Sequence, residues 1–264
     1  MKVLHVPYTW SPDPVGGTEI YVRELVRELA GLGIAGSVAA PRAGPAPARA
    51  TIDGIEVHRY GSSSRTHDVR ELYGVGVPGA PAELSAIIDA ESPDAVHLHG
   101  YAPAIGGAVA REVARRGIPL VATYHTPAVS CQRGTLLRFG DAVCDGRLFV
   151  GRCAACVIQQ HGAPRPVAEA LARLPAAIGR AVAGDRSGPW LALRMRELMA
   201  LHHDDVEQWL GAADRVVAVA KWVRDLLLRL DVAEEKIVLS RQGIARSFAA
   251  SRTPRPDRPS PIRA

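Results

Sequence analysis

A short apolar strand, a paired-glycine loop and an amphipathic helix open this chain. Residues 2–8 are apolar over the length of a strand, and Gly16 and Gly17 lie in the Pro-rich loop that follows. From Glu19 to Leu32, apolar residues recur with helical spacing. Because glycines lack Cβ atoms, a ligand could reach the free backbone N–H groups at this helix N-terminus. The segment therefore predicts a βα turn that suits a diphosphate or a substrate oxygen, although a glycine pair alone is also typical of a plain flexible turn.

Strand-like and helix-like segments alternate along the rest of the chain. Strands are expected over residues 2–8, 35–40, 55–60, 95–99, 120–124, 215–220 and 237–240, and helices near 19–32, 82–91, 104–116, 190–211 and 221–229. Because the strands are apolar on both faces, the pattern predicts an α/β fold, a Rossmann-like parallel sheet with helices on both faces. Ligands of such sheets bind beyond the carboxyl ends of the strands. His99, Gly100 and His125 follow such ends, so we expect them to share one site with Gly16 and Gly17.

Composition narrows the classes of function. The chain has 264 residues, of which 47% are hydrophobic and 22% charged, as in globular proteins. No apolar run approaches the ~20 residues that cross a bilayer, and the N-terminus lacks a signal-peptide pattern, so a cytoplasmic location is expected. The net charge of +5 would suit anionic substrates or an acidic membrane face. Scattered arginines and an aromatic content of 5% argue against nucleic acid as a partner.

All four cysteines lie close together in the sequence, as Cys131, Cys144, Cys153 and Cys156, in the pattern C-x12-C-x8-C-x2-C. The C-x2-C pair predicts a compact knuckle that points two thiolates at one metal. Stable disulfides are disfavoured in the cytosol. We therefore expect a structural Zn²⁺ site, with an iron–sulfur cluster, disulfides or free thiols as alternatives. A bound metal would fold this glycine-rich segment, which we assign to residues 127–165 as a four-cysteine metal-binding insertion.

The domain organisation follows from these segments. One Rossmann-like domain is expected over residues 1–250, with the insertion and a helical segment over 166–211 inside it. In the helical segment, residues 190–201 are amphipathic; core packing is the first interpretation and peripheral contact with the inner face of a membrane the second. Residues 202–205 (His-His-Asp-Asp) are predicted to form a solvated helix face, because adjacent helical residues point in different directions. Four prolines predict a linker or tail over 251–264.

The ordered set of segments resembles the N-terminal, acceptor-side domain of family 4 glycosyltransferases, which have the GT-B fold and use nucleotide sugars. The resemblance rests on the opening strand, glycine loop and helix, and on residues 94–100 (Asp-Ala-Val-His-Leu-His-Gly), 119–126 (Pro-Leu-Val-Ala-Thr-Tyr-His-Thr) and 213–244. It implies that His125 borders the transferred sugar, with Gly16, Gly17, His99 and Gly100 as substrate-binding residues. It further implies retaining transfer from a nucleotide-sugar donor to a hydroxyl acceptor without a catalytic metal.

The same resemblance implies a C-terminal donor domain with a basic pair and a glutamate-bearing motif. No stretch before Ala264 offers these residues, so the chain is expected to be inactive without a second domain. A non-catalytic, zinc-containing binding module on a Rossmann-like scaffold is the alternative. A nicotinamide-dependent oxidoreductase is disfavoured, because no G-x-G-x-x-G follows the first strand and no acidic residue ends the second.

Overall fold

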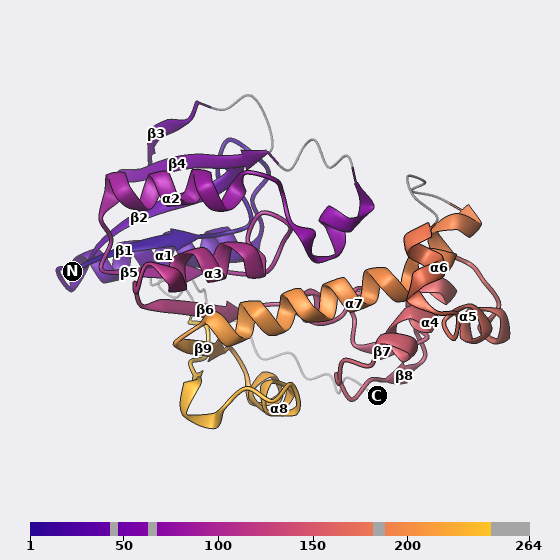
Figure 1. Cartoon of the computed structure of the whole chain (residues 1–264). Coiled ribbons are helices and arrows are strands. Elements are labelled where there is room, and N and C mark those ends of the chain that lie inside the picture. Colours follow the sequence, from indigo (N-terminus) through magenta and orange to yellow (C-terminus); the bar gives the residue numbers. More distant parts are fainter. Residues whose placement is uncertain (43–46, 63–67, 182–187, 244–264) are drawn as a thin grey trace, which may run out of the picture.

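The computed structural model describes residues 1–42, 47–62, 68–181 and 188–243 (Figure 1). Residues 244–250 of the expected domain, and the predicted tail over 251–264, lie outside the described residues. The core element is an 8-stranded sheet with the strand order β10-β9-β6-β5-β1-β2-β4-β3. Its strands are β1 (Lys2–Val6), β2 (Ala35–Arg42), β3 (Arg49–Ile52), β4 (Ile55–Ser62), β5 (Ala95–Leu98), β6 (Leu120–Tyr124), β9 (Arg215–Ala218) and β10 (Ile237–Leu239).

The sheet is mostly parallel, as the alternation of strands and helices predicts. Only the pairing of β3 with β4 is antiparallel among the described strands of this sheet. Residues 41–50 are rich in Pro, Ala and Gly, a composition that predicts a loop, but Arg49 and Ala50 belong to β3, which pairs at the sheet edge with alternating side-chain exposure. An edge strand pairs with a neighbour on one side only and is partly exposed to solvent, so few of its residues have to be apolar.

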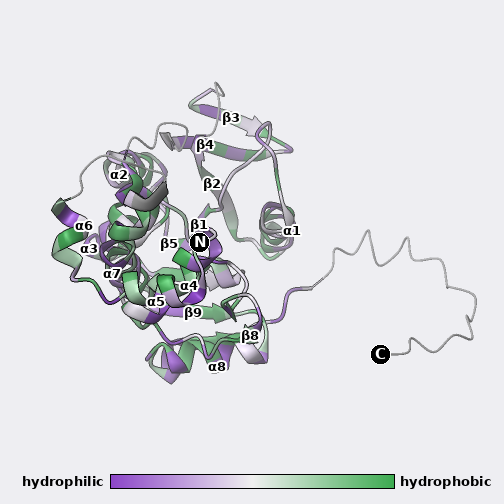
Figure 2. Cartoon of the chain, turned by 90° about the vertical axis from the view of Figure 1, so that its right-hand side faces the viewer, coloured by the Kyte–Doolittle hydropathy of each residue, from purple (hydrophilic) through white to green (hydrophobic). Residues whose placement is uncertain are grey.

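Helices cover both faces of the sheet (Figure 2). The longer ones around it are α1 (Gly17–Gly31), α2 (Ala80–Glu91), α3 (Gly107–Arg115), α7 (Gly188–Ala212) and α8 (Lys221–Arg229); short turns lie at η2 (Glu71–Val75), η3 (Pro127–Val129) and η4 (Glu234–Lys236). On one face, Leu4 and Leu98 belong to a large apolar core with side chains of α2, α3 and α7. On the other, Val22 and Val26 of α1 pack on Val38 of β2. Both faces of the inner strands are thereby removed from water.

The order in which the chain adds strands to the sheet reverses between β1 and β5, although the two strands are parallel. The chain passes from β1 to β2 and β4 on one side, and then returns to β5 and β6 on the other side of β1. Such a reversal in a parallel sheet is a topological switch point, where loops diverge and leave room for a ligand beyond the strand ends.

The segment between β6 and β9 forms a smaller body with its own core. It contains a two-stranded hairpin of β7 (Leu137–Arg138) and β8 (Ala142–Val143), followed by α4 (Val150–Gln160), α5 (Arg165–Leu171) and α6 (Ala176–Ala181). Its apolar cluster is separate from that of the sheet and includes Ala154 and Ile158 of α4 with Leu198 and Met199 of α7. Figure 1 shows α7 running from this body to β9.

Candidate functional site at the carboxyl ends of β1, β5 and β6

Four histidines share one face of the sheet at the switch point. His5 of β1 lies opposite His97 of β5 in the parallel register, so both side chains point to the same face. His99 lies two residues beyond His97 and therefore also points there. His97 faces Val121 of β6, and His125 follows four residues later, again on the same face. Strand alternation and register thus gather these side chains on the α1 side of the sheet.

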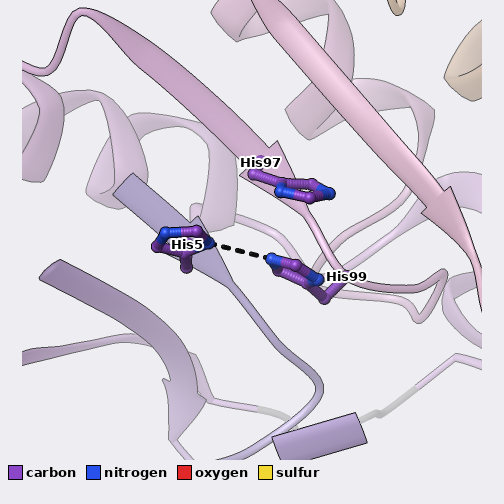
Figure 3. A group of neighbouring side chains, drawn as sticks. All are labelled: His5, His97 and His99. Atoms are coloured by element: carbon purple, nitrogen blue, oxygen red, sulfur yellow. Dashed lines mark hydrogen bonds between the residues drawn. The ribbon is translucent and has the colours of Figure 1, made fainter. Parts of the chain in front are cut away.

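The histidines are joined by short nitrogen–nitrogen contacts. His5 Nδ1 lies 3.0 Å from His99 Nε2 (Figure 3). His99 Nδ1 lies 3.5 Å from His125 Nε2, and His125 Nδ1 lies 2.6 Å from Nε2 of the exposed Gln242. His97 is not part of this series: its Nε2 is 2.7 Å from Thr123 Oγ1, and its ring lies against that of His99 with 3.7 Å between centroids.

Burial makes these histidines weak bases. Desolvation lowers the pKa of His5 to about 4 and that of His125 to about 4. Burial, with a smaller contribution from the neighbouring histidines, holds the pKa values of His97 and His99 well below 6.5. At neutral pH all four rings are therefore uncharged, and each can accept one hydrogen bond and donate one.

The predicted site residues do not all reach the surface. His125 is half-buried and Gln242 beside it is exposed, whereas His99 is fully buried behind His125. Gly100 is also buried, with φ of +138°, and an added Cβ would come within 2.2 Å of Tyr8 Cζ. Gly100 therefore serves a close backbone approach to Tyr8, and the structure does not present it as a surface for a ligand.

The glycine loop is open, as expected. Gly16 and Gly17 are exposed, and no atom of the described residues lies within 4 Å of a Cβ placed on Gly17. However, the Gly16 N–H donates a 2.7 Å hydrogen bond to the buried carboxylate of Glu19. The Glu19 carboxylate therefore occupies the place at the N-terminus of α1 where the helix dipole would favour a bound anion. Tyr21 of the same helix meets the His125 ring edge-on at 5.3 Å, which brings α1 to the histidines.

All four cysteines face one pocket, in the body formed by β7, β8 and α4–α6. Cys131, Cys144, Cys153 and Cys156 line it together with His202 and His203 of α7, and all four thiols are free. Cys153 and Cys156 lie one turn apart on α4 rather than in the predicted knuckle, because Ala154, Ala155 and Ile158 pack this segment as a helix. Among the described residues, the group with ligand atoms within 4.8 Å of one another is His5, His97 and His99, not the cysteines.

The prediction of a solvated face at residues 202–205 was wrong. His202, His203 and Asp205 are 1%, 4% and 5% exposed, because this part of α7 is covered on one side by the insertion and on the other by α3. Asp205 Oδ1 accepts a 3.0 Å hydrogen bond from the Gly107 N–H at the start of α3. Local sequence shows that adjacent residues diverge around a helix, but not how many of its faces are covered.

Several apolar side chains of α7 are also buried, among them Met195, Leu198 and Met199, whereas Trp190 near the start of the helix is 49% exposed. Core packing, the first interpretation of residues 190–201, is what the structure shows. In the described part of the chain, no helix combines the length and apolarity that crossing a bilayer requires.

Comparison with known proteins identifies the family. A search of curated proteins found no match. Similar solved structures include the catalytic domain of starch synthase IV from Arabidopsis thaliana bound to ADP and acarbose (14% identity, TM-score 0.45, 93% of this chain and 52% of that one). Another is UDP-GlcNAc 2-epimerase from Neisseria meningitidis bound to UDP-GlcNAc (13% identity, TM-score 0.42, 90% of this chain and 46% of that one). The chain spans about half the length of these two proteins. The model of Glycosyltransferase Family 4 matches residues 15–247, most of the sequence, and the chain belongs to this family.

Proposed function

We propose that this chain forms the acceptor-side half of a retaining glycosyltransferase, which moves a sugar from a nucleotide-sugar donor to a hydroxyl acceptor. The observation that carries the proposal is the position of His125. It follows the central strand β6 beside the switch point, it is half-buried, and its Nδ1 is hydrogen-bonded to the side chain of Gln242, which is exposed. A neutral imidazole there can orient a sugar hydroxyl by accepting its proton in a hydrogen bond.

Binding of the donor diphosphate is assigned to a second domain. At the glycine loop, Glu19 already supplies the negative charge at the N-terminus of α1. A diphosphate placed beside it would meet a like charge. The open surface of Gly17 therefore suits an uncharged oxygen of the acceptor better than a phosphate.

Transfer assays test this proposal directly. The chain is incubated with UDP-glucose and a panel of saccharide acceptors, alone and fused to the C-terminal domain of a family 4 enzyme. We expect no transfer by the chain alone and transfer by the fusion, lowered about 100-fold by His125→Ala if the ring orients the reacting sugar. Tight binding of UDP-glucose to the chain alone, measured by calorimetry, would contradict the assignment of the donor to another domain.

We also propose that the cysteine pocket holds a structural Zn²⁺ ion, with an iron–sulfur cluster as the alternative. Four free thiols on one pocket support it. Burial raises the pKa of the Cys153 thiol to about 11, so a metal ion would have to displace this proton on binding. The sulfur atoms would have to move closer together around the ion, since tetrahedral zinc needs Zn–S distances of about 2.3 Å.

Metal analysis of the purified chain tests this site. We expect about one zinc per chain, lost in the double variant Cys153→Ser/Cys156→Ser and retained in the exposed control His161→Ala. A brown protein with visible absorption would identify an iron–sulfur cluster instead. Metal-free protein after growth in zinc would refute both. If metal is bound but the fusion transfers no sugar, the zinc-containing binding module becomes the better account of the chain.

A further inference from the structure

The orientation of the Gln242 amide gives the hydrogen bonds around His125 a direction. An amide nitrogen donates and cannot accept, so in this orientation Gln242 Nε2 donates to His125 Nδ1. A neutral imidazole that accepts at Nδ1 carries its proton on Nε2, which donates to His99 Nδ1. By the same rule His99 carries its proton on Nε2, which donates to His5 Nδ1. In this arrangement every Nε2–H donates inward and every Nδ1 accepts on its outer side.

We propose that His99 and His5 are positioning residues: each offers Nδ1 as the acceptor for the Nε2–H of the next ring outward, which holds His125 as the Nε2–H tautomer and leaves its Nδ1, beside Gln242, as a hydrogen-bond acceptor. The ligand group that replaces Gln242 there would be a hydrogen-bond donor, such as a sugar hydroxyl, and not a phosphate oxygen. This inference rests on the proposed function and specifies the ligand chemistry of the same site.

The surroundings of the series agree with this assignment. His5 and His99 are fully buried, so water does not compete for their nitrogen atoms. The far end, His5 Nε2, is buried and has no hydrogen-bond partner among the described residues, so within that part of the chain the series ends there. Gln242 is exposed, and its side chain can therefore leave Nδ1 at little cost when a ligand arrives.

A metal ion is the competing use of these histidines. Single nitrogen atoms of His5, His97 and His99 lie within 4.8 Å of one another. However, His5 and His99 already contact each other through Nδ1 and Nε2 at 3.0 Å, and His97 Nε2 already contacts Thr123 Oγ1 at 2.7 Å. A metal ion that used these nitrogen atoms would have to break both contacts, whereas the hydrogen-bonded arrangement keeps them.

Nitrogen NMR of the full chain with ¹⁵N-labelled histidine reads the tautomers directly. We expect Nε2–H forms for His125, His99 and His5 at pH 7, with ring N–H protons of His125 and His99 protected from exchange. An Nδ1–H form at His125 would overturn the proposal. So would zinc or another metal bound in proportion to the chain and lost in His5→Phe but retained in Cys153→Ser/Cys156→Ser.

Three variants separate positioning from simple packing. His99→Phe keeps a flat ring but removes both nitrogens, so the protected N–H signal of His125 should disappear. His99→Gln keeps one acceptor and one donor, and should restore it. His97→Phe is the matched control, because the His97 ring lies against His99 without joining the series; the His125 signal should persist. Equal loss in all three variants would indicate packing alone and overturn the role of His99.

Two probes of different chemistry test the ligand class. Methyl α-glucoside offers hydroxyl donors without charge, and inorganic phosphate offers anionic acceptors. We expect the glucoside to shift the Nδ1 resonance of His125 and phosphate to leave it unchanged, with about tenfold weaker glucoside binding in His99→Phe, the effect of roughly one hydrogen bond. A response to phosphate, or no response to glucoside, would overturn the ligand assignment. The tautomer spectra do not depend on transfer, so this result is distinguishable from failure of the proposed function.

Discussion

Burial sets the chemistry of single residues in this chain, and the histidines show it most clearly. His5 is fully buried, and burial lowers its pKa from 6.5 to about 4. A weak base of this kind suits hydrogen bonding in its neutral form and does not supply positive charge for phosphate. The site at the strand ends is therefore uncharged at neutral pH along the whole histidine series.

The first prediction concerns acid. Between pH 6.5 and 4 the unfolded chain binds a proton at His5 that the folded chain does not, so stability is lost as the pH falls through this range. The free energy of unfolding should fall by roughly 1.4 kcal/mol per pH unit for this one group. Urea unfolding at pH 7.0 and 5.5 measures it, and His5→Gln should have the smaller difference between the two values. An unchanged difference would show that His5 titrates normally.

The second prediction concerns Gly100. A Cβ at this residue would need φ of +138° and would come within 2.2 Å of Tyr8 Cζ, so Gly100→Ala should lower the free energy of unfolding by about 3 kcal/mol. Gly117 is the matched control: its φ is +69°, but no atom lies within 4 Å of an added Cβ. Gly117→Ala should cost only about 1 kcal/mol, the backbone contribution. If the two variants lost equal free energy in thermal or urea unfolding, the Tyr8 side chain would have moved aside to make room for the Cβ.

At the scale of elements, one side chain of α7 caps the neighbouring helix α3. Asp205 accepts from the Gly107 N–H and so caps α3 from a different helix. A Cβ at Gly106 or Gly107 would lie 2.5 or 2.7 Å from the nearest Asp205 oxygen, so the close approach of the two helices depends on these glycines. Burial raises the pKa of Asp205, which shows that the cap is held away from solvent.

The third prediction tests this cap. Asp205→Ala leaves the Gly107 N–H without a partner and should destabilise the chain by about 1–2 kcal/mol in urea unfolding. Asp205→Asn keeps an acceptor oxygen and removes the buried charge, so its loss should be smaller. An Asn variant as unstable as the Ala variant would show that the carboxylate charge, rather than its hydrogen bond, stabilises the start of α3.

An element could be predicted from the sequence where its pattern of apolar residues lies within the element itself. The strand at Leu120–Tyr124 and the helix at Lys221–Arg229 were predicted with the ends that the structure has, because apolar periodicity is visible within each segment. The helix under Cys153 and Cys156 was missed, since its packing partners lie on α7, far along the chain. The spacing of glycines and cysteines predicts a turn at this segment, whereas its packing against α7 favours a helix.

The candidate site shows the same limit. That His99 and His125 approach each other follows from the rule that parallel strands end at one edge. The contact of His5 with His99 depends on the register of β1 against β5, which no short stretch of sequence contains. Likewise, the burial of His202 follows from the two bodies that enclose α7, and not from its neighbours in sequence.

At the scale of the whole molecule, α7 is shared by two cores. Its N-terminal half contributes Met195 and Leu198 to the core of the insertion, and its C-terminal half contributes Val206 and Trp209 to the core of the sheet. At 1.5 Å per residue, its 25 residues form a rod about 37 Å long. Because a helix bends little over this length, the insertion and its cysteine pocket are held in a fixed position relative to the sheet.

The fourth prediction asks whether the insertion unfolds separately from the sheet. Leu198→Ala removes a fully buried side chain of the insertion core and should cost about 2–4 kcal/mol there. Since the two apolar clusters are separate, hydrogen exchange should speed up for amides of α4 and the first half of α7, while β1 and β5 keep their protection. Leu84→Ala in α2, equally buried in the sheet core, is the matched variant and should have the opposite pattern. If both variants lowered protection equally in both bodies, α7 would couple them into one cooperative unit, and unfolding around the cysteine pocket would then weaken the histidine site as well.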